Sequence, residues 1–447
     1  MLESFEHKGF WWVPSYSGEK VPGVLKYSMD NGITLELIGH FSLGNKFKIL
    51  IDVDCYPPLE VINGKLYDGR LITLLDCQIS ECKTGTIMSL PTFKCVSMII
   101  GPVLFTKKAD VRFRQVVASI QYLNDWLGLN SAFHIEYQPE SSGCKIEYNK
   151  PDAINLQLGT HYQLSFSPCL RFSDYISNNK ATIEQNFNLC VSQACLEQYD
   201  DLISKVRCFQ NLLVLFVQKF PSLLRVTFYK NTEDKVQDRF EYYCRQDVTI
   251  GAHNKLHWFE MILDYQTIAP SFNQIVSKWY NEYKGLENIY IPYFHSFSKD
   301  LNFIDTYLNI CRAIEAFGRH CKVQAGDEPN PRKCNLLQAV VYLHGKYNDT
   351  MNIVLFVKDI HKFAKKLTNH RNRLTHANPI TSELAKNFQE VYDIIEQLKA
   401  FLTIALLRYH GVSSETLNDS LNISHVYSYL KLKKEKEKEK EKEKERA

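Results

Sequence analysis

The spacing of apolar residues changes partway along this chain, and the change restricts the folds that the chain can adopt. Up to about residue 255, short segments alternate apolar and polar residues, which is the pattern of half-buried β-strands. Beyond that point apolar residues recur at steps of three and four, which is the pattern of amphipathic helices. The sequence therefore predicts an α+β protein, with a β-rich N-terminal region followed by an all-α C-terminal helical bundle.

The first hundred or so residues contain a series of short extended segments. Residues 24–41 alternate apolar and polar side chains around Asn31-Gly32, which is a strong hairpin signal. Further segments with strand character lie at residues 47–53, 71–77, 85–90 and 95–104. Short strands separated by turn residues favour a sandwich or barrel-like sheet accompanied by a few helices.

Helical spacing first occurs within this β-rich part. Val117, Ile120, Leu123 and Leu127 share one face of a helix, which predicts a helix within residues 113–129. A second β-rich block is expected from about residue 132 to about residue 190. A helix over residues 196–219, ended by Pro221, and a strand over residues 223–229 are expected next.

The last part of the chain contains four predicted helices. Their apolar stripes lie within residues 307–317, 336–343, 353–367 and 384–405. Four such helices in about 110 residues form a bundle. The predicted domains are a β-rich domain (1–131), a mixed β/α region with a helical exit (132–295), the helical bundle (296–412) and a tail with a disordered Lys/Glu run (413–447).

The Lys/Glu run at residues 433–446 holds eight basic and six acidic residues. Since it has no apolar residue to bury, we expect it to be solvated, either disordered or a lone fluctuating helix. The net charge of the whole chain is only +3, so the rest of the chain is nearly neutral. Any surface that attracts phosphate must therefore be local.

Several classes of protein are not indicated by the sequence. The N-terminus has no basic segment followed by an apolar stretch, so no signal peptide is expected. No segment approaches the roughly 18 consecutive apolar residues of a membrane-spanning helix. The 13 Cys contain no CxxC pair and no zinc-finger spacing. We therefore expect a cytoplasmic protein with reduced thiols and with no membrane partner, no metal and no cofactor.

Aromatic residues near the N-terminus have two interpretations. Trp11, Trp12 and Tyr16 are candidates for binding a partner. Aromatic residues at strand spacing are usually buried, so we expect most of them in the core.

The segment with the clearest chemical character is K-K-L-T-N-H-R-N-R-L-T-H-A-N-P, in which Arg371, Asn372 and His376 form an R-N-x-x-x-H element. On an ideal helix Asn372 and His376 share a face, and Arg371 lies on the neighbouring one. Pro379 predicts that the helix ends close to this element, where the three side chains can converge. A cation, an amide and a titratable imidazole suit chemistry on a phosphodiester.

Arg371 also continues an apolar stripe, four residues after Leu367. A cation on the packed face of a helix is costly unless a counter-charge pairs with it. Glu315, next to Ile314 on the first helix of the bundle, is the candidate partner.

A simpler interpretation needs no catalysis. An Arg followed four to six residues later by a His is expected about once by chance in a chain of this composition. A basic residue and a His near a helix C-terminus also complement the helix dipole. This interpretation explains the charges, but it explains neither Asn372 nor an Arg on the apolar stripe.

The segment H-R-N-R-L-T-H, preceded by Y-L-N-I-C-R-A-I-E-A-F-G-R on an earlier helix, resembles the HEPN nuclease superfamily, and more narrowly the HEPN domain of ApeA-type abortive-infection proteins. H-K-G-F-W-W-V-P, V-P-G-V-L-K-Y, I-N-G-K-L-Y-D-G-R-L-I-T-L-L-D-C and Y-L-N-D-W-L are similar to the ApeA N-terminal domain. Together these segments span most of residues 5–410. The resemblance places the catalytic residues at Arg371, Asn372 and His376, and a supporting glutamate at Glu315.

The resemblance implies an anti-phage endoribonuclease that cleaves RNA without a metal. The ribose 2′-hydroxyl would attack the adjacent phosphorus and leave a 2′,3′-cyclic phosphate. The expected partners are an RNA substrate, with tRNA as one candidate class, and a second copy that forms a homodimer or higher oligomer through the bundle. A phage-derived trigger is expected at the N-terminal region, which would act as a sensor.

Two alternatives remain open. The first is a non-catalytic HEPN-type bundle that binds RNA or nucleotide, or that acts as a dimer scaffold. The second is a structural interaction protein whose helical end only oligomerises. An intact Arg371, Asn372 and His376 favours the enzyme.

Overall fold

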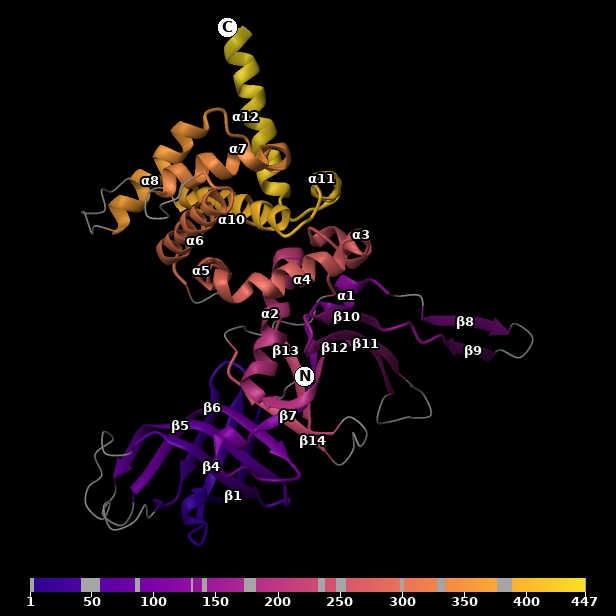
Figure 1. The fold of residues 1–447 in the computed structure, drawn as a ribbon, viewed down its shortest axis with the longest axis vertical. Helices are drawn as coiled ribbons and strands as arrows, with labels where there is room; N and C mark the ends of the chain where they lie inside the picture. The colour runs from indigo at the N-terminus through magenta and orange to yellow at the C-terminus, as the bar shows by residue number, and fades with distance from the viewer. Residues whose placement is uncertain are drawn as a thin grey trace. The chain divides into compact units, whose positions relative to one another are not determined.

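Figure 1 shows the fold in a computed structural model. The structure describes residues 4–41, 57–84, 89–129, 132–138, 143–172, 182–231, 238–246, 255–297, 301–327, 334–375 and 388–446. The chain forms two compact units. Unit 1 comprises Met1–Leu123, Leu129–Arg207 and Pro221–His253, and unit 2 comprises Asn124–Gly128, Cys208–Phe220 and Asn254–Ala447.

Unit 1 is built on one large antiparallel sheet. Its strands are β1 (Phe5–Trp12), β2 (Val21–Ser28), β3 (Gly32–Leu37), β4 (Leu59–Leu66), β5 (Leu71–Thr84), β6 (Ser89–Gly101), β7 (Arg112–Ile120), β10 (Ile154–Leu158), β11 (Tyr162–Phe172), β12 (Ile183–Gln198), β13 (Leu223–Tyr229) and β14 (Arg239–Cys244). A separate two-stranded sheet consists of β8 (Phe133–Gln138) and β9 (Gly143–Tyr148).

The large sheet closes on itself at one end. Its strand order is β10-β11-β12-β7-β13-β14-β6-β3-β2-β1-β4-β5, and β5 also pairs with β6. The last six strands of this order therefore form a barrel, in which the edge strand β5 finds a partner. The predicted β-rich N-terminal region with a barrel-like sheet is confirmed.

The predicted hairpin around Asn31-Gly32 is also confirmed. Strands β2 and β3 pair from Gly23 with Leu37 to Ser28 with Gly32. Gly32 has a φ of 76°, a conformation that favours glycine. The strand predicted at residues 47–53 lies outside the described residues, as does most of the segment 85–90.

The core of the barrel is aromatic and aliphatic, and it includes Trp11. This side chain is 0% exposed, and Trp12 is also buried, whereas Tyr16 is 43% exposed. The expectation that most of these aromatic residues are buried in the core is therefore confirmed for Trp11 and Trp12. Trp11 pairs directly across the sheet with Gly64 on β4, where the absence of a Cβ leaves room for the indole ring.

The helix predicted within residues 113–129 is wrong for most of its length. Residues 112–120 form the strand β7, and only Leu123–Leu127 is helical (α1). Strand β7 lies in the interior of the sheet, between β12 and β13. Its apolar residues are numerous enough to match helical steps by coincidence, but Val116, Ala118 and Ile120 are buried at the period of a strand.

Helix α2 (Tyr199–Val217) runs from unit 1 into unit 2 and confirms the helix predicted at residues 196–219. The remaining helices belong to unit 2. They are α3 (Tyr265–Ile268), α4 (Phe272–Glu282), α5 (Glu287–His295), α6 (Phe303–Gln324), α7 (Leu336–Val354), α8 (Ile360–Thr375), α10 (Phe388–Tyr409), α11 (Ser414–Ile423) and α12 (Ser428–Arg446). The predicted C-terminal helical region is confirmed.

One of its predicted helices is interrupted. The apolar steps at residues 353–367 predicted a single helix, but α7 ends at Val354 and α8 begins at Ile360. The carboxylate of Asp359 accepts hydrogen bonds from the backbone N–H groups of His361 and Lys362, both at 3.0 Å. This cap begins a new helix, which the apolar pattern alone does not indicate.

Helices α4 and α5 are joined to α10 by polar contacts. Lys278 on α4 donates to the backbone carbonyl of Tyr409 at the C-terminal end of α10, with an Nζ–O distance of 2.5 Å. On α5, the hydroxyl of Tyr290 lies 2.7 Å from Nε2 of the buried His410. A cation at a helix C-terminus complements the helix dipole, so these contacts fix the end of α10.

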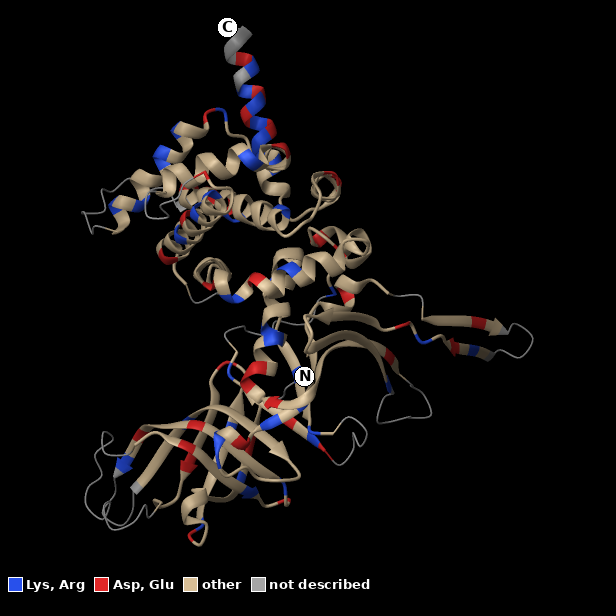
Figure 2. Ribbon diagram, viewed as in Figure 1, with Lys and Arg blue, Asp and Glu red and all other residues tan. Residues whose placement is uncertain are grey.

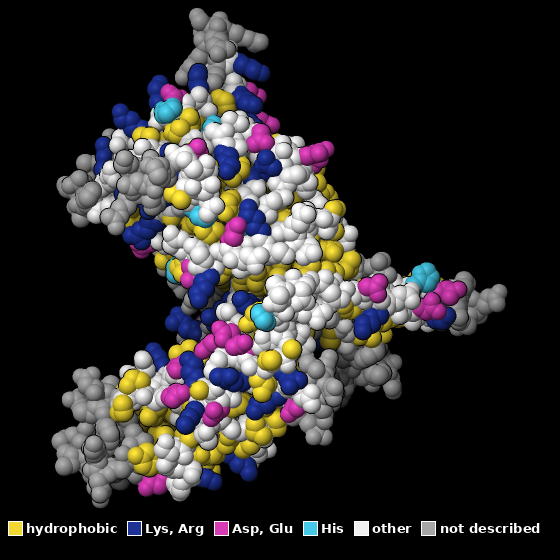
Figure 3. Space-filling view, in the orientation of Figure 1, with side chains coloured by type: hydrophobic (Ala, Val, Ile, Leu, Met, Phe, Trp, Pro, Cys, Tyr) yellow, Lys and Arg dark blue, Asp and Glu magenta, His cyan; other side chains and the backbone are white. Residues whose placement is uncertain are grey.

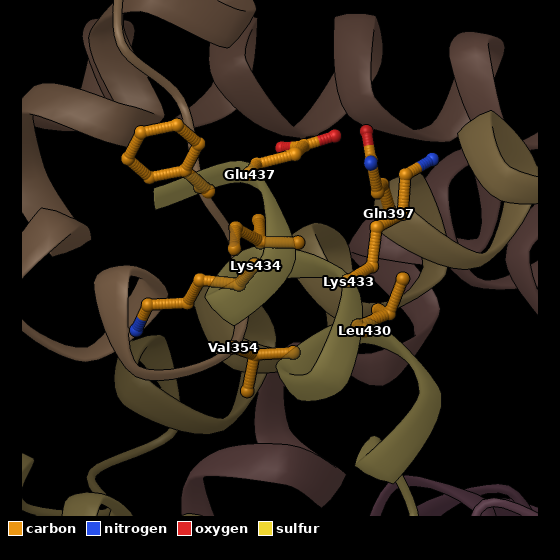
Figure 4. A pocket seen from close by; sticks show the side chains of 8 residues that line it. Val354, Gln397, Leu430, Lys433, Lys434 and Glu437 are labelled. Atoms are coloured by element: carbon orange, nitrogen blue, oxygen red, sulfur yellow. The ribbon is translucent and has the colours of Figure 1, made fainter. Parts of the chain in front are cut away.

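The Lys/Glu run lies in helix α12, and Figure 2 shows acidic and basic residues alternating along it. The first turns of α12 are anchored on the bundle. Lys433 pairs with the mostly buried Asp393 of α10 at 2.5 Å, and Lys434 donates to backbone carbonyls at the end of α7. Figure 4 shows the small hollow that Lys433 and Lys434 line together with Val354, Gln397, Leu430 and Glu437.

Among the described residues, no helix has the combination of length and apolar character that crossing a membrane requires.

The close approach of Trp11 to Gly64 gives a test of the barrel. A Cβ built on Gly64 would overlap the fully buried Trp11 ring. We expect Gly64→Ala to lower the stability of unit 1 by about 1–3 kcal/mol, as overpacking does. Thermal unfolding monitored by circular dichroism checks this, with Gly18→Ala as the control because nothing lies within 4 Å of its added Cβ. Equal unfolding temperatures for the two variants would contradict this packing.

Candidate functional site

One face of α6 carries four residues at steps of four. They are Tyr307, Cys311, Glu315 and Arg319. Residues at this spacing lie one above another along a helix. The hydroxyl of Tyr307 donates to the backbone carbonyl of Leu367 on α8, with an O–O distance of 2.8 Å. This face of α6 therefore contacts α8 one turn before Arg371.

The centre of the site is an acidic side chain shared by two guanidiniums. The Oε2 atom of Glu315 lies 3.0 Å from an Nη2 atom of Arg371, and its Oε1 atom lies 3.0 Å from Nη2 of Arg319. The three side chains are 25%, 28% and 35% exposed respectively. The contact predicted between Arg371 and Glu315 is present, and it provides the counter-charge for an Arg on a packed helix face.

Sequence reasoning missed Arg319. Besides its pairing with Glu315, Arg319 donates to the backbone carbonyl of Cys334, just before α7, at 3.1 Å. Its position four residues after Glu315 is the signal that could have indicated the ion pair. The contact with Cys334 has no such signal, because it joins two segments that only the fold brings together.

The wall behind Arg371 is buried and neutral. Burial raises the pKa of the Cys311 thiol to about 12, although the nearby Arg371 opposes the shift. Burial likewise raises the pKa of the Tyr307 hydroxyl well above its usual value. Both groups are uncharged at neutral pH, so Glu315 is the counter-charge that the structure shows for Arg371.

The other residues of the motif have different surroundings. Asn372 and Arg373 are exposed on α8, and the hydroxyl of Thr375 donates to the backbone carbonyl of Arg371 at 2.5 Å. His376 lies outside the described residues. The structure thus brings Glu315 and Arg371 together, and it places Asn372 next in the chain on the solvent side of the same helix.

His370 precedes Arg371 in the chain and has different neighbours. It lines a small apolar cavity of about 10 Å³ together with Tyr307, Leu374, Val391 and Ile394. Burial lowers the pKa of His370, and the neighbouring Lys366 and Arg373 act in the same direction. The cavity has room for about one water molecule. It is therefore too small for a nucleotide.

Two guanidiniums on one carboxylate leave an excess of one positive charge. Each guanidinium has five N–H groups, so the ion pairs leave further donors for phosphate oxygens. The described residues contain no group of three or more His, Cys, Asp or Glu side chains arranged to hold a metal ion. The arrangement is suited to binding a phosphate group by charge and hydrogen bonds.

The shared carboxylate gives a test of stability. In Glu315→Gln the two guanidiniums lose their counter-charge. Because these side chains are partly exposed, we expect a loss of about 1–2 kcal/mol rather than the full cost of a buried unpaired charge. Asp419→Asn, which removes one acidic charge from an exposed position on α11, is the matched control and should be neutral. Chemical unfolding of both variants measures the difference, and equal stabilities would mean that the bridge contributes nothing.

Two protein families match the chain. Residues 6–279 match the family described as ApeA N-terminal domain 1, and residues 308–416 match the family described as Apea-like HEPN. The first match covers more than half of the 447 residues, and the guanidinium cluster lies within the second. No curated protein and no solved structure matches the chain.

Proposed function

Since this chain belongs to the family of the ApeA N-terminal domain 1 and carries an Apea-like HEPN domain, we propose that it is a metal-independent endoribonuclease of anti-phage abortive infection. A HEPN domain of this type indicates a ribonuclease role in defence. One observation links the proposal to particular residues: Glu315 pairs with the guanidinium of Arg371. Arg371 lies near the end of α8 and is the first residue of the R-N-x-x-x-H element.

In the proposed reaction, the ribose 2′-oxygen attacks the adjacent phosphorus while a base removes its proton. The bond from phosphorus to the 5′-oxygen then breaks, and an acid protonates that oxygen. The products are a 2′,3′-cyclic phosphate and a 5′-hydroxyl. His376 is the group for proton transfer, since an imidazole with an unperturbed pKa of about 6.5 can take or give a proton near neutral pH.

Arg371 has an electrostatic role in this scheme. Negative charge grows on the non-bridging oxygens as the 2′-oxygen attacks, and a guanidinium fixed beforehand stabilises it without reorganisation. Both carboxylate oxygens of Glu315 already accept hydrogen bonds from Arg residues. This arrangement supports a positioning role for Glu315 rather than proton transfer. Arg319 adds a second cation, and Asn372 orients the scissile phosphate or the imidazole.

The reaction needs a base and an acid at the same time, whereas one chain supplies one motif histidine. We propose that two copies pair through the helical bundle and face their motifs across a shared cleft. Such a two-fold interface provides His376 twice. The N-terminal region acts as the sensor that releases the nuclease when a phage-derived trigger is present, and the substrate is an RNA such as a tRNA.

The test compares cells that carry the wild type, Arg371→Ala or His376→Ala during phage infection. We expect RNA fragments and growth arrest with the wild type alone, because loss of either group should slow cleavage by about 10²–10³-fold or more. Arg373→Ala is the matched control: this Arg is exposed on the same helix, two residues from Arg371, and the variant should retain cleavage.

The same proteins, purified from infected cells, are then tested for RNA cleavage in the presence of EDTA. The wild type and Arg373→Ala should cleave, and Arg371→Ala and His376→Ala should not. Equal phage protection by the wild type and His376→Ala would contradict the catalytic proposal. RNA binding without cleavage would then favour the non-catalytic HEPN-type module.

A further inference from the structure

Strands β8 and β9 form a hairpin of their own. They pair with each other from Phe133 with Tyr148 onward in an unbroken antiparallel register, and neither joins the large sheet. Within the described part of the chain, the outer edges of both strands therefore lack a strand partner. An isolated two-stranded hairpin is marginally stable in water, and an unpaired regular edge is a template for another strand.

One face of this hairpin is apolar throughout its described side chains. Because side chains alternate along a strand, Phe133, Ile135 and Tyr137 of β8 lie on the same face as their partners Tyr148, Ile146 and Cys144 of β9. Ile135 and Ile146 are each 49% exposed, and Tyr137 is 76% exposed. Such a concentration of exposed apolar side chains is a feature of interaction surfaces.

The opposite face is charged. Lys145 and Glu147 of β9 lie on either side of Ile146 in the sequence and contact each other at 2.5 Å. The ammonium of Lys145 lowers the pKa of the Glu147 carboxyl, which is therefore ionised at neutral pH. In Figure 3 the hairpin of β8 and β9 presents acidic, basic and His side chains on the face in view. Figure 2 shows opposite charges on strand β9.

This sequence is self-complementary about Ile146. If two antiparallel copies of β9 pair with Ile146 opposite Ile146, Lys145 of each copy lies opposite Glu147 of the other, and Cys144 lies opposite Tyr148. We propose that β9 is an interaction surface for a second copy of this chain, joined edge to edge about a two-fold axis at Ile146.

The edge of β8 that lacks a strand partner among the described residues fits a second copy less well. A two-fold axis at Ile135 would place His134 opposite Glu136, which is not a pairing of a Lys ammonium with a carboxylate. The β9 pairing instead joins two groups of opposite formal charge, twice per interface. It also converts two hairpins into a four-stranded sheet with one continuous apolar face, which reaches the size at which a sheet is stable.

A cross-linking experiment on the full chain tests the register. Residues opposite each other in an antiparallel pair have Cα atoms about 4.5–5.5 Å apart, within the range of a disulfide. In a Cys144→Ser background, Ile146→Cys should give a disulfide-linked dimer under mild oxidation. Ile135→Cys in the same background is the control, and it should give no more disulfide-linked dimer than Cys144→Ser alone. Dimer from the control and not from Ile146→Cys would overturn the proposal in favour of β8.

Charge reversal tests the complementarity. Lys145→Glu and Glu147→Lys, each added to the Ile146→Cys chain, place like charges opposite each other and should abolish the dimer band. An equimolar mixture of the two chains restores opposite charges, so the band should return. Lys150→Glu and Asp152→Lys make the same charge changes at exposed positions beyond β9 and should leave the band unchanged.

Failure of the mixture to restore cross-linking would refute the β9 pairing. RNA cleavage by these variants is measured separately, so this outcome is distinguishable from failure of the proposed nuclease.

Discussion

The sharing of one carboxylate between two guanidiniums determines how the candidate site is built. Arg371 occupies a position on α8 that otherwise faces the packed interior, and a cation there requires a counter-charge. Glu315 supplies it from α6, and Arg319 on the same helix occupies its second oxygen. Along this face of α6, the hydroxyl of Tyr307 donates to the backbone carbonyl of Leu367 on α8, and about two turns later Glu315 accepts from the guanidinium of Arg371. The position of Arg371 relative to α6 follows from these two contacts.

The same arrangement favours one kind of chemistry over another. A carboxylate that already accepts from two guanidiniums is poorly placed to remove a proton, whereas a guanidinium fixed on one side still has donors for a phosphate. The neutral wall of Tyr307 and Cys311 lowers the local dielectric behind Arg371. Charge interactions with a phosphate are stronger there than in water. The proposal therefore assigns electrostatic stabilisation to Arg371 and leaves proton transfer to His376.

Much of the fold could be predicted because local signals and tertiary environment agree. The strand at residues 223–229 and the helix at residues 196–219 are bounded by Pro221, and their apolar periods match their burial. The sequence of strand β7 also matches a helical period, because an interior strand is rich in apolar residues. The interruption between α7 and α8 was missed because the apolar stripe continues across it, while the polar side chain of Asp359 decides where α8 begins.

The candidate site was predictable to the extent that its chemistry is local. An Arg on an apolar stripe requires a partner, and this requirement predicts the contact with Glu315 from the sequence alone. The part played by the backbone of Cys334, which also binds Arg319, depends on how separate segments pack and has no signature in the sequence. Likewise, the sequence shows the charges around Ile146, but it does not show that β9 lies at the edge of its sheet among the described residues.

The most direct measurement of the central claim removes the proposed nucleophile from the substrate. The cleaved nucleotide of a target RNA is replaced by its 2′-deoxy form, and cleavage is followed in EDTA with the active wild-type protein. Attack by the 2′-hydroxyl predicts that cleavage at that bond is lost, while other sites in the same RNA are still cut. Continued cleavage at the 2′-deoxy position would contradict the account, since the nucleophile would then have to be water or a protein group.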